Sequence, residues 1–166
     1  MTLPPEDLSP RKLIGRFTAL REAAIDTSSL IYMLKAGFLG LLAGVVTLRT
    51  VEEVVQESGW PSLPVVVDHP GARREEEVDT DALLLNFAVN RRLPLISEDR
   101  ALLLKAGEAG LEYYNSLMML ALLRYRGRID TAWYTEAKSH LLEVARYGDE
   151  ILRRYAGICE LLGFEG

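Results

Sequence analysis

Apolar positions follow two different spacings along the chain. Short apolar runs rich in Val, Ile and Leu predict strands, at EAAID, GVVTL, SLPVVVDHP and LPLIS (22–26, 44–48, 62–70 and 93–97). Segments with apolar residues three and four positions apart predict helices, at 8–23, 28–37, 38–44, 49–59, 79–92, 98–110 and 114–127, with two more from 130 that break near Gly148. Ser28 or Ser29 is the predicted cap of the helix at 28–37.

The order of these elements indicates the fold class. Strand and helix alternate through most of the chain, and the strands are short and apolar throughout rather than alternating. Such a pattern favours an α/β protein with a mostly parallel sheet covered by helices on both faces. A length of 166 residues suits a single domain, residues 1–166, with a substantial core.

Composition narrows the function classes. The formal net charge of −5 argues against a surface built throughout to hold nucleic acid, although it does not exclude a nuclease with clustered carboxylates. Cys159 is the only cysteine, which favours a reducing cytoplasmic location, and its apolar helical surroundings predict a core residue. The longest apolar stretch, 37–48, is too short to span a bilayer, so no membrane association is expected.

Four acidic residues follow predicted strands. Asp26 ends the first strand, and Glu53, Asp81 and Asp99 lie at or near the starts of later helices. In an open parallel sheet, strand ends and the helix starts that follow them share one edge, where ligands bind. We therefore expect these carboxylates to approach one another, with Asp79 as the alternative to Asp81.

Most of these acids also have a structural explanation. The segment Thr50–Glu53 has the spacing of a capping box, so Glu53 could serve its own helix. Asp79 and Asp81 suit the cap and first turn of a helix, and Asp99 follows Ser97, a predicted cap. Asp26 is the hardest to explain in this way, because an apolar strand gains nothing from an acid at its buried end.

A group of carboxylates also predicts the kind of metal. Carboxylates brought together repel one another, and a hard divalent cation relieves that repulsion. Mg²⁺ and Mn²⁺ prefer oxygen ligands. His69 and His140 are far apart and each is isolated, which does not favour a zinc site.

Three segments together resemble the PIN domain family, in particular the VapC-like toxin ribonucleases of type II toxin–antitoxin systems. They are IDTSSLIYML, TVEEVVQES and DTDALLLNFAVNRRLPLISEDRALLLKAG. The resemblance covers about residues 22–127 and leaves a C-terminal helical extension at about 130–166. It implies a three-layer α/β/α PIN-like fold with a short, mostly parallel sheet.

The resemblance also implies an activity, a metal-dependent endoribonuclease that cuts RNA in single-stranded loops. Asp26, Asp81 and Asp99 would bind Mg²⁺ or Mn²⁺, and Glu53 would orient the attacking water or act as general base. Ser28 and Asn115 would be polar neighbours of the metal ligands. An antitoxin protein would be the partner, and a homodimer is expected.

Asn115 marks a departure from the family pattern. Many members carry a further Asp just after the last strand, where this chain has Asn115 and Ser116. Asn115 could hold a metal or a water, or it could simply cap the helix that follows. The missing acid leaves a second interpretation open, a catalytically weak or inactive PIN-fold binding or scaffold protein.

Two features of the sequence concern binding partners: arginines near the candidate site and one apolar segment. RNA could be held by five arginines, for which solvation and helix ending are the simpler explanations: Arg73, Arg74, Arg91, Arg92 and Arg100. The segment LIYMLKAGFLGLL is apolar on more faces than one surface helix needs, which would suit a dimer interface or a fully buried helix.

Two further function classes fit less well. A receiver or phosphoryl-transfer domain would use a strand-end Asp with a second Asp or an inward-reaching Lys, and the segment DTSS lacks the second acid. The lysines after Asp26 all lie in helical patterns. A DNA-binding regulator would need a basic recognition helix, and none is evident.

Overall fold

The computed structural model describes residues 10–68 and 79–166. The helices in these ranges are α1 Pro10–Thr18, α2 Thr27–Ala36, α3 Leu39–Ala43, α4 Glu52–Ser58, α5 Thr80–Arg91, α6 Arg100–Glu108, α7 Ser116–Tyr125, α8 Thr131–Val144 and α9 Asp149–Leu162. The strands are β1 Glu22–Ile25, β2 Thr47–Val51, β3 Val66–Asp68, β4 Leu95–Ile96 and β5 Tyr113–Tyr114.

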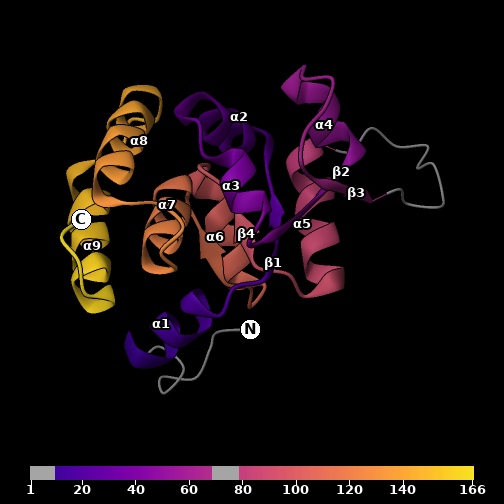
Figure 1. Cartoon of the computed structure of the whole chain (residues 1–166). Coiled ribbons are helices and arrows are strands. Elements are labelled where there is room, and N and C mark those ends of the chain that lie inside the picture. Colours follow the sequence, from indigo (N-terminus) through magenta and orange to yellow (C-terminus); the bar gives the residue numbers. More distant parts are fainter. Residues whose placement is uncertain (1–9, 69–78) are drawn as a thin grey trace.

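The strands form one parallel sheet in the order β3-β2-β1-β4-β5. In register, Ala24 of β1 lies opposite Arg49 of β2 and Leu95 of β4. Helix α5 packs against β1 and β2 on one side, and α2, α3 and α7 pack together on the other, with α8 and α9 outside them (Figure 1). The predicted three-layer α/β/α class with a parallel sheet is therefore confirmed.

Several predicted boundaries were wrong. Strand β2 begins at Thr47 rather than Gly44, because Val45 and Val46 still hydrogen-bond through their N–H groups to Leu42 at the end of α3. Tyr114, the second residue of strand β5, was predicted as the start of a helix. The strand is only two residues long, and both are aromatic, so no periodicity could reveal it. The first helix ends at Thr18, well before the predicted end at residue 23.

The segment 30–42 is buried within the chain itself. Five of its large apolar side chains are at most 1% exposed, namely Leu30, Met33, Phe38, Leu39 and Leu42. Four others are partly buried, namely Ile31, Tyr32, Leu34 and Leu41. Helix α2 contacts α3, α4, α7 and α8, so it is covered on several sides. Burial within one copy of the chain therefore explains most, but not all, of the apolar positions of this segment.

Helices α8 and α9 pack onto the outer side of this helical layer. Helix α8 contacts α2 and α7, and α9 contacts α7 and α1. The hydroxyls of Tyr134 and Tyr155 hydrogen-bond to each other between the two helices. Cys159 is completely buried, as predicted. Within the ranges that the structure describes, no helix has the length and apolar character needed to cross a bilayer.

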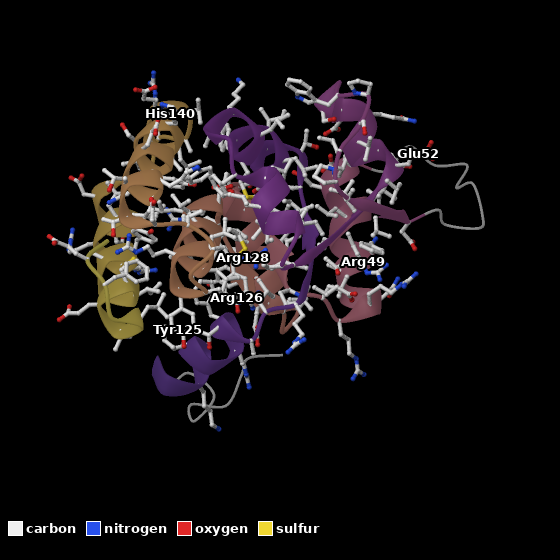
Figure 2. All side chains as sticks on the ribbon, in the orientation of Figure 1. Arg49, Glu52, Tyr125, Arg126, Arg128 and His140 are labelled. Atoms are coloured by element: carbon white, nitrogen blue, oxygen red, sulfur yellow. The ribbon has the colours of Figure 1, made fainter. Side chains whose placement is uncertain are left out.

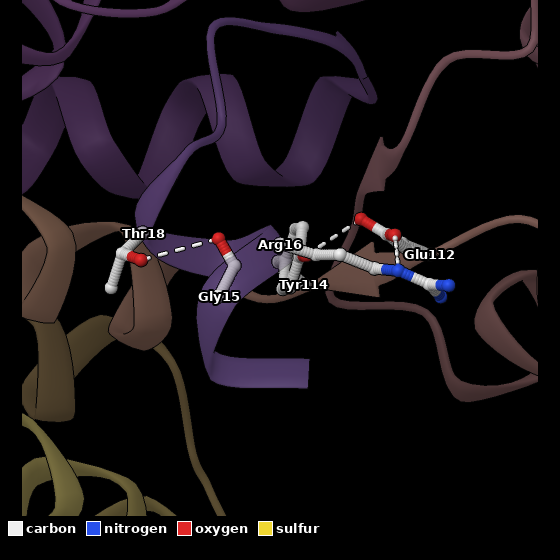
Figure 3. A network of polar contacts seen from close by, with 5 residues as sticks. All are labelled: Gly15, Arg16, Thr18, Glu112 and Tyr114. Atoms are coloured by element: carbon white, nitrogen blue, oxygen red, sulfur yellow. Dashed lines mark hydrogen bonds and ion pairs between the residues drawn. The ribbon is translucent and has the colours of Figure 1, made fainter. Parts of the chain in front are cut away.

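Polar contacts attach the N-terminal helix to the rest of the fold. Arg126, at the end of α7, donates to the carbonyls of Thr18, Leu20 and Val45 and so joins three segments (Figure 2). Figure 3 shows a second attachment, in which Glu112 accepts a 3.0 Å hydrogen bond from the Tyr114 hydroxyl and lies 3.5 Å from the Arg16 Nε.

Candidate functional site

Asp26 lies where the central strand β1 ends, at the carboxyl edge of the sheet. Its carboxylate accepts a 2.9 Å hydrogen bond from the Ser29 N–H, which makes Asp26 the N-cap of α2. The Ser28 hydroxyl donates to both carboxylate oxygens at 3.1 Å, and the Ser97 hydroxyl donates to Oδ2. The predicted cap, Ser28 or Ser29, was wrong, because the helix begins one residue earlier and the aspartate occupies the capping position.

Asp26 is almost completely buried, with only 4% of its surface exposed. Burial raises the pKa of its carboxyl group, and the negative charge of Glu98 adds to that rise, while hydrogen bonds from Ser97 and Ser29 oppose it. The net direction is upward. Asp26 is therefore a carboxylate that the fold holds in place by hydrogen bonds, although its charged form is disfavoured by desolvation.

Asp81 lies in the first turn of α5 and is partly buried. Burial raises the pKa of its carboxyl group, and four other carboxylates raise it further, in the order Asp79, Asp99, Asp26 and Glu57. Three of these carboxylates directly precede helices, Asp26 before α2, Asp79 before α5 and Asp99 before α6, and Glu57 lies in α4. The sequence-predicted acids Asp26, Asp81, Asp99 and the alternative Asp79 therefore share one edge of the sheet.

Asp99 and Asp79 both precede helices, but only Asp99 caps its helix through its side chain. Asp99 is exposed and accepts a 3.1 Å hydrogen bond from the Leu102 N–H, so it is the N-cap of α6 in place of the predicted Ser97. The Ser97 hydroxyl instead accepts from the Asp99 N–H and donates to Asp26. Asp79 is the N-cap residue of α5 but its side chain makes no capping hydrogen bond.

Helix α4 contributes a glutamate that the sequence did not single out. The predicted capping box was wrong, because Thr50 belongs to β2 and donates its hydroxyl to the Ile25 carbonyl of β1. Glu53 lies in the first turn of α4 and is half-buried. Glu57, one turn later, accepts a 3.0 Å hydrogen bond from Thr27 beside Asp26. A spacing of four residues places both glutamates on one face of the helix.

Glu98 is a second acid that sequence reasoning missed. Its carboxylate accepts from the Ser29 hydroxyl at 2.5 Å, from the Ser116 N–H at 3.0 Å, from the Ser116 hydroxyl at 3.1 Å and from the Tyr147 hydroxyl. It thus joins the starts of α2 and α7 to the segment between α8 and α9. The only signal in the sequence was its place beside Asp99 in the SED turn.

Three of the remaining predicted polar residues, Asn115, Ser28 and Arg91, have local partners. Asn115 accepts a 2.9 Å hydrogen bond from the Met118 N–H, which makes it the N-cap of α7, one of the two roles expected of it. Ser28 lies beside Asp26, as its predicted role requires. Arg91 forms an ion pair with Asp68 at 2.8 Å, and Arg92 ends α5 in a left-handed conformation. Arg73 and Arg74 lie outside the described residues.

The donor set restricts the kind of cation that could bind. In residues 10–68 and 79–166, no three His, Cys, Asp or Glu side chains converge closely enough to hold a metal ion. His140 lies at the outer end of α8 (Figure 2), and His69 is outside the described ranges. Mg²⁺ commonly binds through one or two carboxylates and keeps several waters. A cation at this edge would therefore have to keep several waters, because the described residues do not form a cage of protein ligands.

Comparison of the chain with protein-family models, with curated proteins and with solved structures found no match.

Proposed function

We propose that the protein is a metal-dependent ribonuclease whose site is the carboxyl edge of the sheet. The observation that carries this proposal is the placement of the carboxylates, with Asp26 at the end of β1, Asp79 and Asp81 at the start of α5 and Asp99 at the start of α6, near enough to Asp81 to act on its charge. Such mutual repulsion is unfavourable for folding, and groups perturbed in this way cluster at functional sites. The location at the ends of parallel strands is where open α/β sheets bind ligands.

Asp26 and Asp81 are the residues that would hold Mg²⁺ or Mn²⁺, with Asp99 at the exposed rim. When bound, the cation would neutralise charge on a phosphate oxygen and make a bound water more acidic. Ser28 and Ser97 hold the Asp26 carboxylate in a fixed orientation through their hydroxyls. Glu53 remains the proposed residue for orienting the attacking water.

The substrate and partners are proposed from the resemblance to PIN-domain toxins. That resemblance supports single-stranded RNA as substrate, an antitoxin protein as partner and a homodimer as the assembly. The single, buried cysteine supports a cytoplasmic location. Glu57 is an alternative to Glu53, supported by its hydrogen bond beside Asp26 and its effect on the pKa of Asp81.

One observation favours a second function, a non-catalytic binding or scaffold protein of the same fold. The carboxylates of Asp26 and Asp99 already serve as helix caps. In the described part of the chain no three-ligand group is assembled. Carboxylates that only cap helices, without binding a metal, would show both of these features.

A cleavage assay separates the two functions. Purified protein is incubated with a pool of structured RNAs in Mg²⁺, in Mn²⁺ or in chelator, beside the variants Asp81→Asn and Asp149→Asn. Asp149 is a matched control, because it also lies in the first turn of a helix, α9, but is not among the carboxylates that raise the pKa of Asp81. Each variant removes one negative charge.

The ribonuclease proposal predicts metal-dependent cutting that Asp81→Asn abolishes and Asp149→Asn retains. Calorimetric titration of Mg²⁺ should show binding that weakens in the Asp81→Asn variant alone. Cutting that persists in chelator, or that both variants retain, would contradict the assigned site. Absence of both cutting and Asp81-dependent metal binding would favour the scaffold function.

A further inference from the structure

A small cleft opens beside Asp81 between α5 and α6. Its volume is about 80 Å³, which is room for about two or three waters or one phosphate group, at roughly 30 Å³ for each water. Its lining residues come from both helices: Asp81, Ala82, Leu85, Asn86, Leu102 and Lys105. The cleft is therefore continuous with the candidate site through Asp81.

The polar lining of the cleft is asymmetric. Asp81 supplies one negative charge, whereas Lys105 and Asn86 supply an ammonium group and an amide that can both donate hydrogen bonds. Both of these side chains are exposed, so a ligand could reach them from solvent. Within the described ranges, Lys105 makes no side-chain hydrogen bond or ion pair. The other lining residues are apolar, and Leu102 is buried beneath them.

We propose that this cleft binds a phosphate of the single-stranded RNA next to the phosphodiester that is cut, with Lys105 as its cation and Asn86 as a second donor. The inference rests on the proposed ribonuclease function. A lysine ammonium is a point charge that binds phosphate without reading sequence. Repulsion by the Asp81 carboxylate places the phosphate toward the Lys105 side of the cleft.

The chain offers a matched control for Lys105. Lys105 lies in the last turn of α6, where a basic residue also interacts favourably with the helix dipole. Lys35 likewise lies in the last turn of its helix, α2, is also exposed, and lines a different cleft together with Trp133, Glu136 and His140. Lys105→Gln and Lys35→Gln therefore each remove one positive charge from the last turn of a helix.

Fluorescence anisotropy with a labelled single-stranded RNA, in chelator so that no cutting occurs, tests the proposal across a salt series. For a single strand, each phosphate contact contributes about 0.7 to the slope of log affinity against log salt. Lys105→Gln should lower the slope by about 0.7 and weaken binding at 0.1 M salt by about fivefold, the same amount for RNAs of different sequence. Lys35→Gln should bind as the unaltered protein does.

Two further variants test the placement of the phosphate. Lys105→Arg keeps the charge and should bind nearly as the unaltered protein, whereas Asn86→Asp places a carboxylate in the cleft and should weaken binding. Equal affinities and slopes for Lys105→Gln, Lys35→Gln and the unaltered protein would overturn the phosphate site. Circular dichroism of every variant checks that the fold is retained.

The outcomes also separate this inference from the function on which it rests. Metal-dependent cutting by a protein whose RNA affinity does not depend on Lys105 would refute the cleft and leave the ribonuclease proposal intact. Lys105-dependent RNA binding without cutting would support the cleft and favour a binding protein. If the unaltered protein neither binds nor cuts RNA, both proposals are wrong.

Discussion

Two substitutions of Asp26 separate the effect of its hydrogen bonds on stability from the effect of its buried charge. Asp26→Asn keeps the shape of the side chain, and its amide oxygen can still accept from the Ser29 N–H, because Asn is as good an N-cap as Asp. Its amide nitrogen can donate to the Ser97 or Ser28 hydroxyl. Asp26→Ala removes all of these hydrogen bonds.

The expected effects differ in sign. Asp26→Ala loses the cap of α2, which costs about 1 kcal/mol. It also removes the acceptor of the fully buried Ser97 hydroxyl, and a buried group left without its partner costs about 1–3 kcal/mol. The free energy of unfolding should fall by about 2–4 kcal/mol. Asp26→Asn removes a desolvated charge and should make the protein more stable at neutral pH.

The pH dependence of the stability follows from the direction in which folding shifts the pKa of Asp26. The pKa of Asp26 is raised in the folded protein above the unfolded value of about 3.8. Between these two values the folded state binds more protons than the unfolded state, so this group makes the folded state less stable as pH rises. The advantage of Asp26→Asn should therefore grow as pH increases through that window and shrink to a constant below pH 3.8.

Urea unfolding of the unaltered protein and both variants, from acid to neutral pH, measures these differences. The comparison uses the difference between proteins at each pH, so that titration of the other carboxylates largely cancels. If Asp26→Asn is less stable than the unaltered protein at neutral pH, or if its relative stability falls as pH rises, the reasoning about desolvation is refuted. If Asp26→Ala is no less stable, the hydrogen bonds do not hold α2.

Three further substitutions test contacts away from Asp26, each by urea unfolding. Arg126→Met removes the donor to three backbone carbonyls and should lower the free energy of unfolding by at least about 2–3 kcal/mol. Arg128 is exposed, so Arg128→Met should change the free energy of unfolding little. Equal effects of the two substitutions would show that Arg126 does not hold these segments together. Tyr147→Phe removes one donor to the Glu98 carboxylate and should lower the free energy of unfolding by about 1.5–3 kcal/mol. An unchanged midpoint of the urea transition would mean that water replaces the hydroxyl. Asn115→Ala removes the cap of α7 and should cost about 1 kcal/mol, and a gain in stability would rule out capping.

Long-range architecture could be predicted from the sequence better than local boundaries could. Alternating apolar strands and helices predicted a parallel sheet and its covering layers, because each apolar face must be buried in any fold. The ends of elements depend on competition between neighbouring hydrogen bonds. Thr50 has the composition of a helix cap, yet its hydroxyl bonds to the Ile25 carbonyl in the adjacent strand. That partner is 25 positions away in the chain, so local spacing could not indicate it.

In the candidate site, too, some residues could be predicted from the sequence and others could not. Asp26, Asp81 and Asp99 could be placed on one edge, because that edge follows from parallel topology alone. Glu57 and Glu98 could not be singled out, since one appears as an exposed helical glutamate and the other as a charged residue in a turn. Their significance comes from the elements that contact them. Glu98 draws donors from residues 69, 18 and 49 positions away.

The hydrogen bond between Tyr147 and Glu98 has a consequence for shortened forms of the protein. The last two helices look dispensable in the sequence, because they follow the segment that resembles a family core. A chain that ends before Tyr147 would lose a donor at the carboxyl edge of the sheet, and would also lose α9 and so uncover the part of α7 that α9 contacts. Loss of activity in such a chain would therefore report damage to the site, and could not be attributed to loss of a separate partner-binding segment.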